Sequence, residues 1–420
     1  MESIDKQVSV LMHGSEFGDA QIKETMTKDL RQKLVDAGKE GRPLRVYCGF
    51  DVTAPDIHLG HTIPMRKLRQ FQEFGHDVIF LIGTFTTLIG DPSDRDEARA
   101  EALQDVVKKN AETYAAQAFK ILDEKKTTIR YNYEWLSELS FTDVISMASC
   151  FTVQQFLARD RIRNRIDRND PIWLRELLYP LAQGYDAVHL KADVQIGATE
   201  QLFNLMAGRR LQEAFGQKPQ VCITFPVLVG TDGVQRMSKS TGNYIGVTES
   251  PEQIYGKVMS VSDTLIMQYF ELLTDVPEEE LAKIKQQLDA GENPMDLKKQ
   301  LAKNIVTQLY SQKDADEAEG HFKKVVQNKE LPDDIPEIDI KNIQASFKDL
   351  SPQQMETTGV YLPKLLTVAG LATSVSEANR FISQGAVNID GAKILNTVAH
   401  IKIGSIIKVG KRRYRKIVIK

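Results

Sequence analysis

The segment LRVYCGFDVTAPDIHLGHTIPM, Leu44 to Met65, decides the fold of this chain. It begins with a short apolar strand at 44–47, passes through a loop, and enters a run of helical hydrophobic period that reaches Phe74. A second apolar strand is predicted at 78–82. The order strand, loop, helix, strand is typical of a parallel α/β sheet, in which ligands bind beyond the carboxyl ends of the strands.

The tetrapeptide HLGH, residues 58–61, marks the expected start of the first helix. His58 and His61 share one face of its first turn, beside unpaired backbone N–H groups and the positive end of the helix dipole, which favour a phosphate. Gly60 has no Cβ, so a ligand can approach the backbone. These residues alone leave two alternatives to phosphate binding. The histidines could act only as helix caps and packing, or they could bind zinc. The zinc alternative is weak, because zinc-binding helices usually have histidines four residues apart and a further ligand.

The length of 420 residues predicts two or three domains, and the hydrophobic fraction of 42% is sufficient for globular cores. No apolar run is long enough to cross a membrane, and the first ten residues lack the pattern of a signal peptide. Cys48, Cys150 and Cys222 are far apart and predict neither a disulfide framework nor a zinc cluster. We therefore expect a cytoplasmic protein with no membrane partner.

The formal net charge of −3 conceals an uneven distribution. Residues 361–420 contain eleven Lys or Arg against two acidic residues, a net charge of +9, whereas the remainder of the chain has a net charge of −12. A basic tail on an acidic body indicates a polyanionic partner, such as nucleic acid. The alternative is a basic module that is merely soluble.

Three features between 90 and 190 are candidates for the site or its surroundings. The turn after the second strand places Asp91 at the mouth of the presumed site, although a turn role alone would explain this residue. Residues 94–176 are predicted to be a mostly helical insertion, whose charged run is typical of a solvated face. In the helix that follows, a polar stripe at helical spacing indicates a polar ligand, or else a solvent-facing surface; it consists of Tyr179, Gln183 and Asp186.

The α/β pattern then resumes, with strands predicted at 193–196 and 221–229. The loop GTDGVQRMSKSTGN, Gly230 to Asn243, follows the second of these strands and carries Arg236 and Lys239. A mobile loop with cations at this edge of a sheet can neutralise a polyphosphate. Taken by itself, the loop could equally be an exposed polar turn.

HLGH, followed about 180 residues later by RMSKS, resembles the paired signatures of the class I aminoacyl-tRNA synthetases, usually written HIGH and KMSKS. The segments YCGFDVTAPDIHLGH, LIGDPS and QIGATEQ, together with the polar stripe, narrow the resemblance to the tyrosyl-tRNA synthetases over nearly the whole chain. The resemblance implies an α/β fold in which a Rossmann-like parallel-sheet catalytic domain is followed by a helical domain and a small α+β RNA-binding domain. The implied ranges are 1–249 for the catalytic domain with its insertion at about 94–176, 250–328 for the helical anticodon-side domain, 329–355 for an extended linker, and 356–420 for the RNA-binding domain.

The resemblance also implies a reaction in two steps. Tyrosine and ATP form tyrosyl-adenylate and pyrophosphate, and tyrosine then passes to the 3′ end of tRNA(Tyr). Mg²⁺ is expected to accompany ATP, and a homodimer is the expected state. No metal-binding side chains are implied.

The residue roles carried over from the family fall into three groups. The catalytic residues at the ATP phosphates are His58, His61, Thr53, Arg236 and Lys239, and the remaining ATP contacts are Cys48, Asp51, Gly60 and Met237. Tyr47 and Asp186 match the contacts to the phenolic hydroxyl of tyrosine, while Asp91, Tyr179 and Gln183 match the amino-group side, with Gln201 nearby. RNA binding is assigned to Arg380, Lys411, Arg412, Arg413 and Arg415. For Cys48, packing of a small residue remains an alternative.

Two positions depart from the commoner bacterial pattern. Arg236 replaces the first Lys of KMSKS, which keeps the cation but changes its geometry. GATEQLFN stands where many members have GGSDQWGN, which affects the assignment of Gln201. The rival interpretations are a tryptophanyl-tRNA synthetase and a non-catalytic RNA-binding paralogue; the polar stripe and the intact signatures argue against them.

Overall fold

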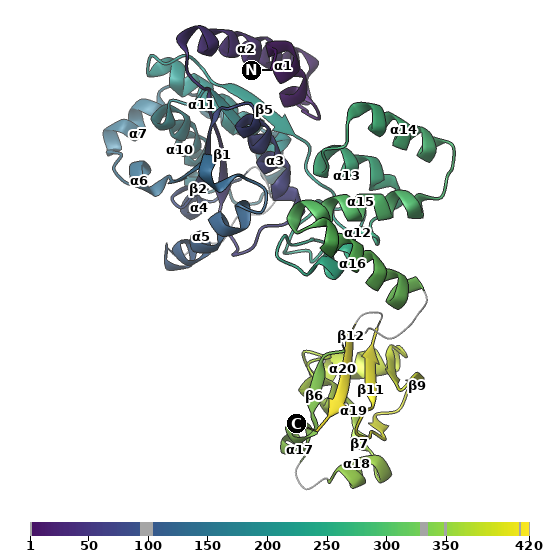
Figure 1. Cartoon of the computed structure of the whole chain (residues 1–420). Coiled ribbons are helices and arrows are strands. Elements are labelled where there is room, and N and C mark those ends of the chain that lie inside the picture. The colour runs from purple at the N-terminus through teal and green to yellow at the C-terminus, as the bar shows by residue number, and fades with distance from the viewer. Residues whose placement is uncertain (1, 93–103, 328–334, 348–350, 411–412, 420) are drawn as a thin grey trace. The chain divides into compact units, whose positions relative to one another are not determined.

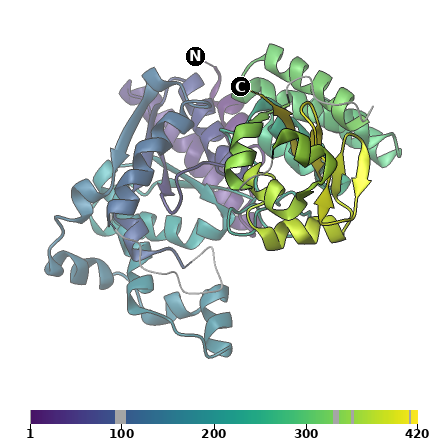
Figure 2. The ribbon, with the colours of Figure 1, turned by 90° about the horizontal axis from the view of Figure 1, so that it is seen from below.

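The computed structural model of this chain describes residues 2–92, 104–327, 335–347, 351–410 and 413–419. The chain divides into two compact units, Met1–Glu319 and Gly320–Lys420, and many of their elements are labelled in Figure 1. The first unit can also be followed from below in Figure 2. No helix among the described residues is both long and apolar enough to cross a membrane.

The first unit is built on a five-stranded parallel sheet in the order β3-β2-β1-β4-β5. Its strands are β1 (Arg45–Asp51), β2 (Asp77–Gly83), β3 (Thr127–Tyr131), β4 (Val194–Ala198) and β5 (Val221–Phe225). The chain builds outward from β1 in one direction through β2 and β3, and in the other through β4 and β5. The pairing of β1 with β4 extends only to Tyr47 and Gln195, so a crevice opens beyond this pair, toward the carboxyl ends of the two strands.

Helices cover this sheet because the strands, buried on both faces, need apolar partners on each side. Helix α3 packs on β1, β2 and β4, and the contact between α10 and α11 is the most extensive between any two elements. The helices of this part of the unit are α1 (Ile4–Met12), α2 (Ala20–Glu40), α3 (Leu59–Glu73), α4 (Thr86–Ile89), α5 (Gln104–Ala118), α6 (Tyr133–Leu136), α7 (Phe141–Ala148), α8 (Val153–Leu157), α9 (Asp160–Asp167), α10 (Leu174–Leu190) and α11 (Leu202–Ala214), with short 3₁₀ turns η1 (Glu124–Lys126) and η2 (Thr199–Gln201).

The predicted helical insertion is wrong in one respect, because β3 lies inside the range 94–176 and pairs with β2 as part of the sheet. This strand, TTIRY, is at the sheet edge and only partly buried, so it lacks the continuous apolar run of the central strands. The strand predicted at 221–229 is also shorter than expected. It ends at Phe225 because Pro226 has no N–H to continue the ladder.

A helical region completes the first unit after the sheet. Two of its helices begin with local cap chemistry: Ser250 accepts from the N–H of Gln253 ahead of α12, and Asn293 accepts from that of Met295 ahead of α15. In each case a proline occupies the first helical turn. The elements are α12 (Pro251–Val258), η3 (Asp263–Leu265), α13 (Ile266–Leu273), α14 (Glu278–Asp289), α15 (Pro294–Leu309) and α16 (Gln312–Phe322), which leads into the π-helical turn η4 (Lys323–Gln327).

The second unit is a small α+β domain with a five-stranded sheet in the order β6-β12-β11-β8-β9 and a separate β10-β7 pair. Asp390 and Gly391, both at positive φ, make the tight turn between β8 and β9. Its elements are β6 (Glu337–Asp339), α17 (Ile340–Ser346), α18 (Pro352–Thr357), β7 (Val360–Tyr361), α19 (Leu362–Val368), α20 (Val375–Ser383), β8 (Val387–Ile389), β9 (Ala392–Ile394), β10 (Val398–Ala399), β11 (Ile406–Val409) and β12 (Arg413–Val418).

The prediction of an extended linker at 329–355 is wrong for the residues that the structure describes in that range. Strand β6 pairs in parallel with β12, and helix α17 follows it. Ile338, Ile343 and Phe347 are buried in the core of the second unit. Because β6 is only three residues long and lies among prolines and acidic residues, its pairing was not visible as a sequence pattern.

Candidate functional site

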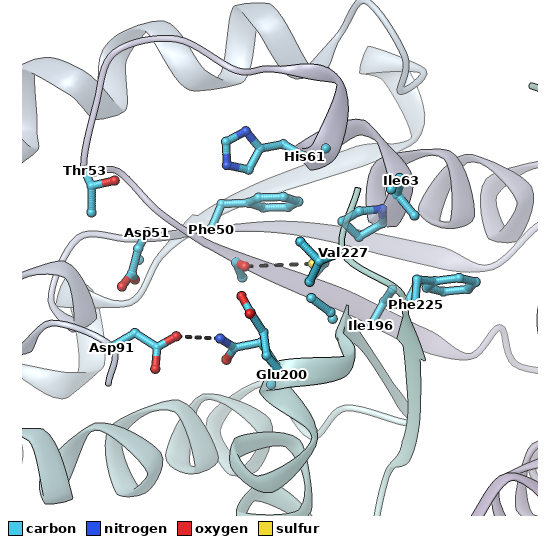
Figure 3. Close-up of a pocket in the computed structure, with 18 of the residues that line it drawn as sticks. Phe50, Asp51, Thr53, His61, Ile63, Asp91, Ile196, Glu200, Phe225 and Val227 are labelled. Atoms are coloured by element: carbon cyan, nitrogen blue, oxygen red, sulfur yellow. Dashed lines mark hydrogen bonds between the residues drawn. The ribbon is translucent and has the colours of Figure 1, made fainter. Parts of the chain in front are cut away.

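A single cavity of about 460 Å³ lies at the carboxyl ends of β1 and β4, where the strand order reverses. Figure 3 shows Thr53 and His61 on one side of it and Asp91 and Glu200 on the opposite side. Every residue that the sequence assigned to ATP or tyrosine lines this cavity: Tyr47, Cys48, Asp51, Thr53, His58, Gly60, His61, Asp91, Tyr179, Gln183, Asp186, Gln201, Arg236, Met237 and Lys239.

The two histidines of HLGH are helix caps and also face the cavity. Nδ1 of His58 accepts from the N–H of Gly60 at 3.2 Å, and Nδ1 of His61 accepts from the N–H of His58 at 3.2 Å. The rings stack with their centroids 3.8 Å apart. Because each Nδ1 is an acceptor, the proton of each neutral ring is on Nε2, which remains a donor for a ligand.

Both imidazoles are held neutral at physiological pH. Burial, the neighbouring His61 ring and the cations Lys239 and Arg236 lower the pKa of His58 to about 2. Burial and Lys239 lower the pKa of His61 to about 4. Because both rings are neutral, they can donate hydrogen bonds to phosphate while neither carries a buried charge. A bound polyanion would raise both pKa values again.

The loop 230–243 places its two cations at the cavity, each beside an acidic residue. Lys239 Nζ donates to the carbonyl of Asp56 and lies 3.6 Å from its carboxylate, while Arg236 Nη1 lies 3.3 Å from Oε1 of Glu200. Burial lowers the pKa of Lys239, and Asp56 opposes that shift. Both cations therefore sit at the cavity wall beside carboxylates that a polyphosphate could replace.

The deep end of the cavity is suited to a hydroxyl group. Asp186 is fully buried and accepts from Trp135 Nε1 at 2.8 Å and from Asn132 Nδ2 at 3.2 Å. Burial raises the pKa of Asp186 to about 8. The hydroxyl of Tyr47 is buried without a hydrogen-bond partner among the described residues, and burial raises its pKa as well. A buried hydroxyl without a hydrogen-bond partner, close to a carboxyl group, strongly favours the binding of a polar ligand atom at this end of the cavity.

The other polar groups of the cavity form a second cluster nearer its mouth. Gln201 donates from Nε2 to Asp91, the interaction drawn as a dashed line in Figure 3. Tyr179 donates its hydroxyl to Asp51 at 3.1 Å. The side-chain oxygen of Gln183 is buried and has no partner within the described residues. Carboxylates and an amide oxygen together can accept hydrogen bonds from an ammonium group.

Sequence reasoning missed three residues of the site. Asn132 and Trp135 hold Asp186, and Glu200 holds Arg236. Asn132 directly follows β3, so recognising 127–131 as a strand would have placed it at the carboxyl edge with the other ligands. Glu200 lies in the QIGATEQ segment, directly before Gln201 and just after β4, so its position could have been recognised in the same way, whereas no local signal exists for Trp135.

The residues assigned to RNA binding lie elsewhere. Arg380, Arg413 and Arg415 are in the second unit, where the guanidinium groups of Arg380 and Arg413 both lie over the ring of Phe381. Lys411 and Arg412 lie outside the described residues. Cys48 is buried and its thiol pKa is raised by burial, so it stays a neutral thiol at the cavity wall. Among the described residues there is no group of three His, Cys, Asp or Glu side chains that could hold a metal ion.

The sequence is similar to known enzymes over almost its full length. Residues 39–327 match the family described as tRNA synthetases class I (W and Y). A tyrosine–tRNA ligase of Carboxydothermus hydrogenoformans is 49% identical over 396 residues, which cover 93% of this chain and 94% of that protein. One from Desulfotalea psychrophila is 44% identical over 422 residues, with 100% and 99% coverage.

Solved structures share the fold of the first unit. The tyrosyl-tRNA synthetase of Archaeoglobus fulgidus complexed with L-tyrosine has a TM-score of 0.59 at 22% identity, covering 75% of this chain and 99% of that one. A tryptophanyl-tRNA synthetase from Plasmodium falciparum has a TM-score of 0.54 at 15% identity, covering 76% and 89%. The fold alone therefore does not separate the two amino acids.

Proposed function

This chain belongs to the tyrosyl-tRNA synthetases within the class I family for tryptophan and tyrosine, and we propose that the cavity between β1 and β4 is where it activates tyrosine. The enzyme is a ligase that joins tyrosine to its tRNA using ATP. One observation carries the site assignment: both signatures and the polar stripe, which are far apart in the sequence, line one cavity.

At the ATP end, the two histidines donate from Nε2 to phosphate oxygens, with Thr53 at the exposed mouth beside them. Lys239 and Arg236 leave Asp56 and Glu200 and neutralise the charge that develops on the departing pyrophosphate. The remaining ATP contacts in this assignment are Cys48, Asp51, Gly60 and Met237.

At the tyrosine end, Tyr47 and Asp186 contact the phenolic hydroxyl. Asp91, Tyr179, Gln183 and Gln201 surround the amino group, where the orphan oxygen of Gln183 gains a donor. Phenylalanine would leave the buried groups at the deep end without a partner, so it should bind poorly; this is the discrimination for which tyrosyl-tRNA synthetases are the standard example.

The first step needs no general base, because the tyrosine carboxylate is already a nucleophile at neutral pH. It attacks the α-phosphorus, the bond to the bridging oxygen of pyrophosphate breaks, and the electron pair leaves with pyrophosphate. The protein contributes alignment and charge stabilisation. The ribose hydroxyl at the 3′ end of the tRNA then attacks the tyrosyl carbonyl and releases AMP.

Mg²⁺ is assigned to the ATP phosphates. Asp51, Asp91 and Glu200 line the cavity, but each already accepts from a protein donor, and the described residues hold no three-residue metal cluster. The ion would therefore be bound mainly through phosphate oxygens and water.

A homodimer is supported by apolar side chains that remain exposed between residues 141 and 174. They lie on α7, α8, α9 and the start of α10, and Phe141 and Leu174 are 80% and 75% exposed. An excess of large exposed apolar side chains in one segment is typical of a segment that a partner covers. We further propose that the protein acts in the cytoplasm and that the basic second unit binds the tRNA.

Tyrosine-dependent exchange of pyrophosphate into ATP tests the site assignment. Wild-type protein should catalyse the exchange with tyrosine, and far less with tryptophan or phenylalanine. His61→Ala should lower the exchange rate without a comparable loss of tyrosine affinity. Equal exchange with tryptophan, or an unaffected His61→Ala variant, would refute the assignment.

A further inference from the structure

The loop 230–243 that presents Arg236 and Lys239 has one polar side chain that is almost fully buried. Asn243, at the end of the loop, is 4% exposed, whereas most of its neighbours in the loop are exposed or half-buried. A buried amide must find partners for both of its ends. The partners of Asn243 are all within this loop.

The amide of Asn243 bonds to both sides of the second signature. Its Oδ1 accepts from the N–H of Ser238 at 2.8 Å and from the hydroxyl of Thr241 at 2.7 Å. Its Nδ2 lies within hydrogen-bonding distance of the carbonyl of Arg236 at 3.0 Å and the carboxylate of Asp232 at 2.8 Å. The backbone before and after Met237 is thereby fixed by one side chain.

The start of the loop is shaped around the same amide. A Cβ at Gly230 would lie 2.3 Å from Nδ2 of Asn243, so any other residue there would displace it. The N–H of Thr231 donates to the backbone carbonyl of Asn243 at 2.9 Å, and the N–H of Met237 donates to Leu228 at 2.7 Å. Asn243 therefore connects the first residues of the loop to its last ones through its backbone, and holds the segment around Met237 through its side chain.

From this geometry we propose that Asn243 is a positioning residue for the first reaction step, which fixes the turn that presents Arg236 and Lys239 to the ATP phosphates. The inference rests on the proposed function of these two cations. Two properties are required at position 243, a donor and an acceptor at the end of a short side chain, and asparagine has both. An aspartate would keep the acceptor but place its negative charge against Asp232 and the carbonyl of Arg236.

The test compares Asn243→Asp with a chemically identical change elsewhere. Asn293→Asp is the matched control, because Asn293 caps α15 through its side-chain oxygen and aspartate caps equally well. For Asn243→Asp we expect the rate of tyrosyl-adenylate formation to fall by roughly tenfold or more, with the Kd for tyrosine unchanged within about twofold. Asn293→Asp should match the wild type in both quantities.

A double variant provides the rescue. In Asn243→Asp with Asp232→Asn, a donor and an acceptor again face each other with their roles exchanged, so part of the lost rate should return. Tyrosine binding by the single variant reports that the rest of the site is folded. A wild-type rate in Asn243→Asp would overturn the proposal, as would a loss of tyrosine affinity equal to the loss of rate.

Lys239→Ala, measured in parallel, separates this inference from the function on which it rests. A slow Lys239→Ala beside a fast Asn243→Asp would refute only the role of Asn243. A fast Lys239→Ala would refute the proposed role of the loop itself.

Discussion

The backbone N–H of Leu59 donates to the carbonyl of Ile245 at 2.9 Å. Two residues away on each segment, the N–H of Val247 donates back to the carbonyl of Ile57 at 3.0 Å, so that His58 and Gly246 between them form an antiparallel bridge. The first signature is thereby joined to the segment that directly follows the second. The end of the loop that carries Lys239 is therefore fixed to the start of the helix that carries His61.

Replacing Lys239 with alanine should slow tyrosyl-adenylate formation far more than it weakens tyrosine binding. The Lys239 cation lies on a loop and not in the tyrosine end of the cavity, and charge develops on pyrophosphate only in the transition state. Single-turnover kinetics and equilibrium binding measure the two quantities. Equal losses in both would show that Lys239 acts on ground-state binding.

Asp186→Asn should relax discrimination between tyrosine and phenylalanine, or abolish activation. Trp135 and Asn132 direct their donors at both oxygens of Asp186, and an asparagine would turn its NH₂ group against one of them. The ratio of kcat/KM for the two amino acids in pyrophosphate exchange reports the change. An unaltered ratio would place the phenolic contact on another residue.

The buried Asp186 should also give the enzyme a characteristic pH dependence of stability. Its pKa is about 8 in the folded protein, above its value in the unfolded chain, so its contribution is fully present below about pH 4 and is lost as the pH rises through 8. Asp186→Asn lacks this dependence. Measured without tyrosine, the free energy of unfolding of the variant minus that of the wild type should therefore increase between pH 4 and pH 8, by at most about 5 kcal/mol.

A constant offset between the two proteins is expected, because the variant also disturbs the hydrogen bonds to Trp135 and Asn132. Only the slope of the difference against pH is diagnostic. Parallel stability curves would mean that Asp186 stays ionised in the folded protein.

A chain that ends at residue 327 should keep pyrophosphate exchange and lose efficient tRNA charging. Every residue assigned to ATP or tyrosine lies in the first unit, and the segment with a net charge of +9 lies in the second. The truncated enzyme should show a higher KM for tRNA and a shallower dependence on salt, because phosphate contacts are lost. Full charging efficiency at physiological salt would exclude the second unit as the tRNA anchor.

The position of the cut matters for this experiment. A chain that ends at residue 355 keeps β6 and α17 but removes the strand and helices against which they pack, which exposes Ile338, Ile343 and Phe347. This longer protein should aggregate more than the one that ends at 327, as light scattering would detect.

Leu174→Glu should convert a dimer into monomers at micromolar concentration. Leu174 is 75% exposed at the start of α10, so a charge there would disturb an interface without disturbing the core. Leu395→Glu is the matched control, because Leu395 is also well exposed but lies in the second unit. Sedimentation velocity measures the outcome; a dimer that survives Leu174→Glu would place the interface elsewhere.

The sequence by itself determined four of the five strands of the parallel sheet, the position of both signatures and most of the side chains that line the cavity. The apolar runs at β1, β2 and β4 are buried on both faces, and the caps at Ser250 and Asn293 depend on residues at most three positions away. Such signals are local, so they can be read without knowing the fold. The family signatures also predicted which residues line the cavity, because the order and spacing of the two signatures are typical of enzymes that activate an amino acid with ATP.

The tertiary structure alone decided which groups hold the site residues in place. The partners of Asp186 come from positions 132 and 135, more than 50 residues earlier, and no periodicity links them. The same holds for β6, whose three residues become a strand only because β12 offers a free edge. A buried polar group takes whichever partner the folded backbone brings within about 3 Å, and that choice depends on packing between distant elements, not on neighbouring residues.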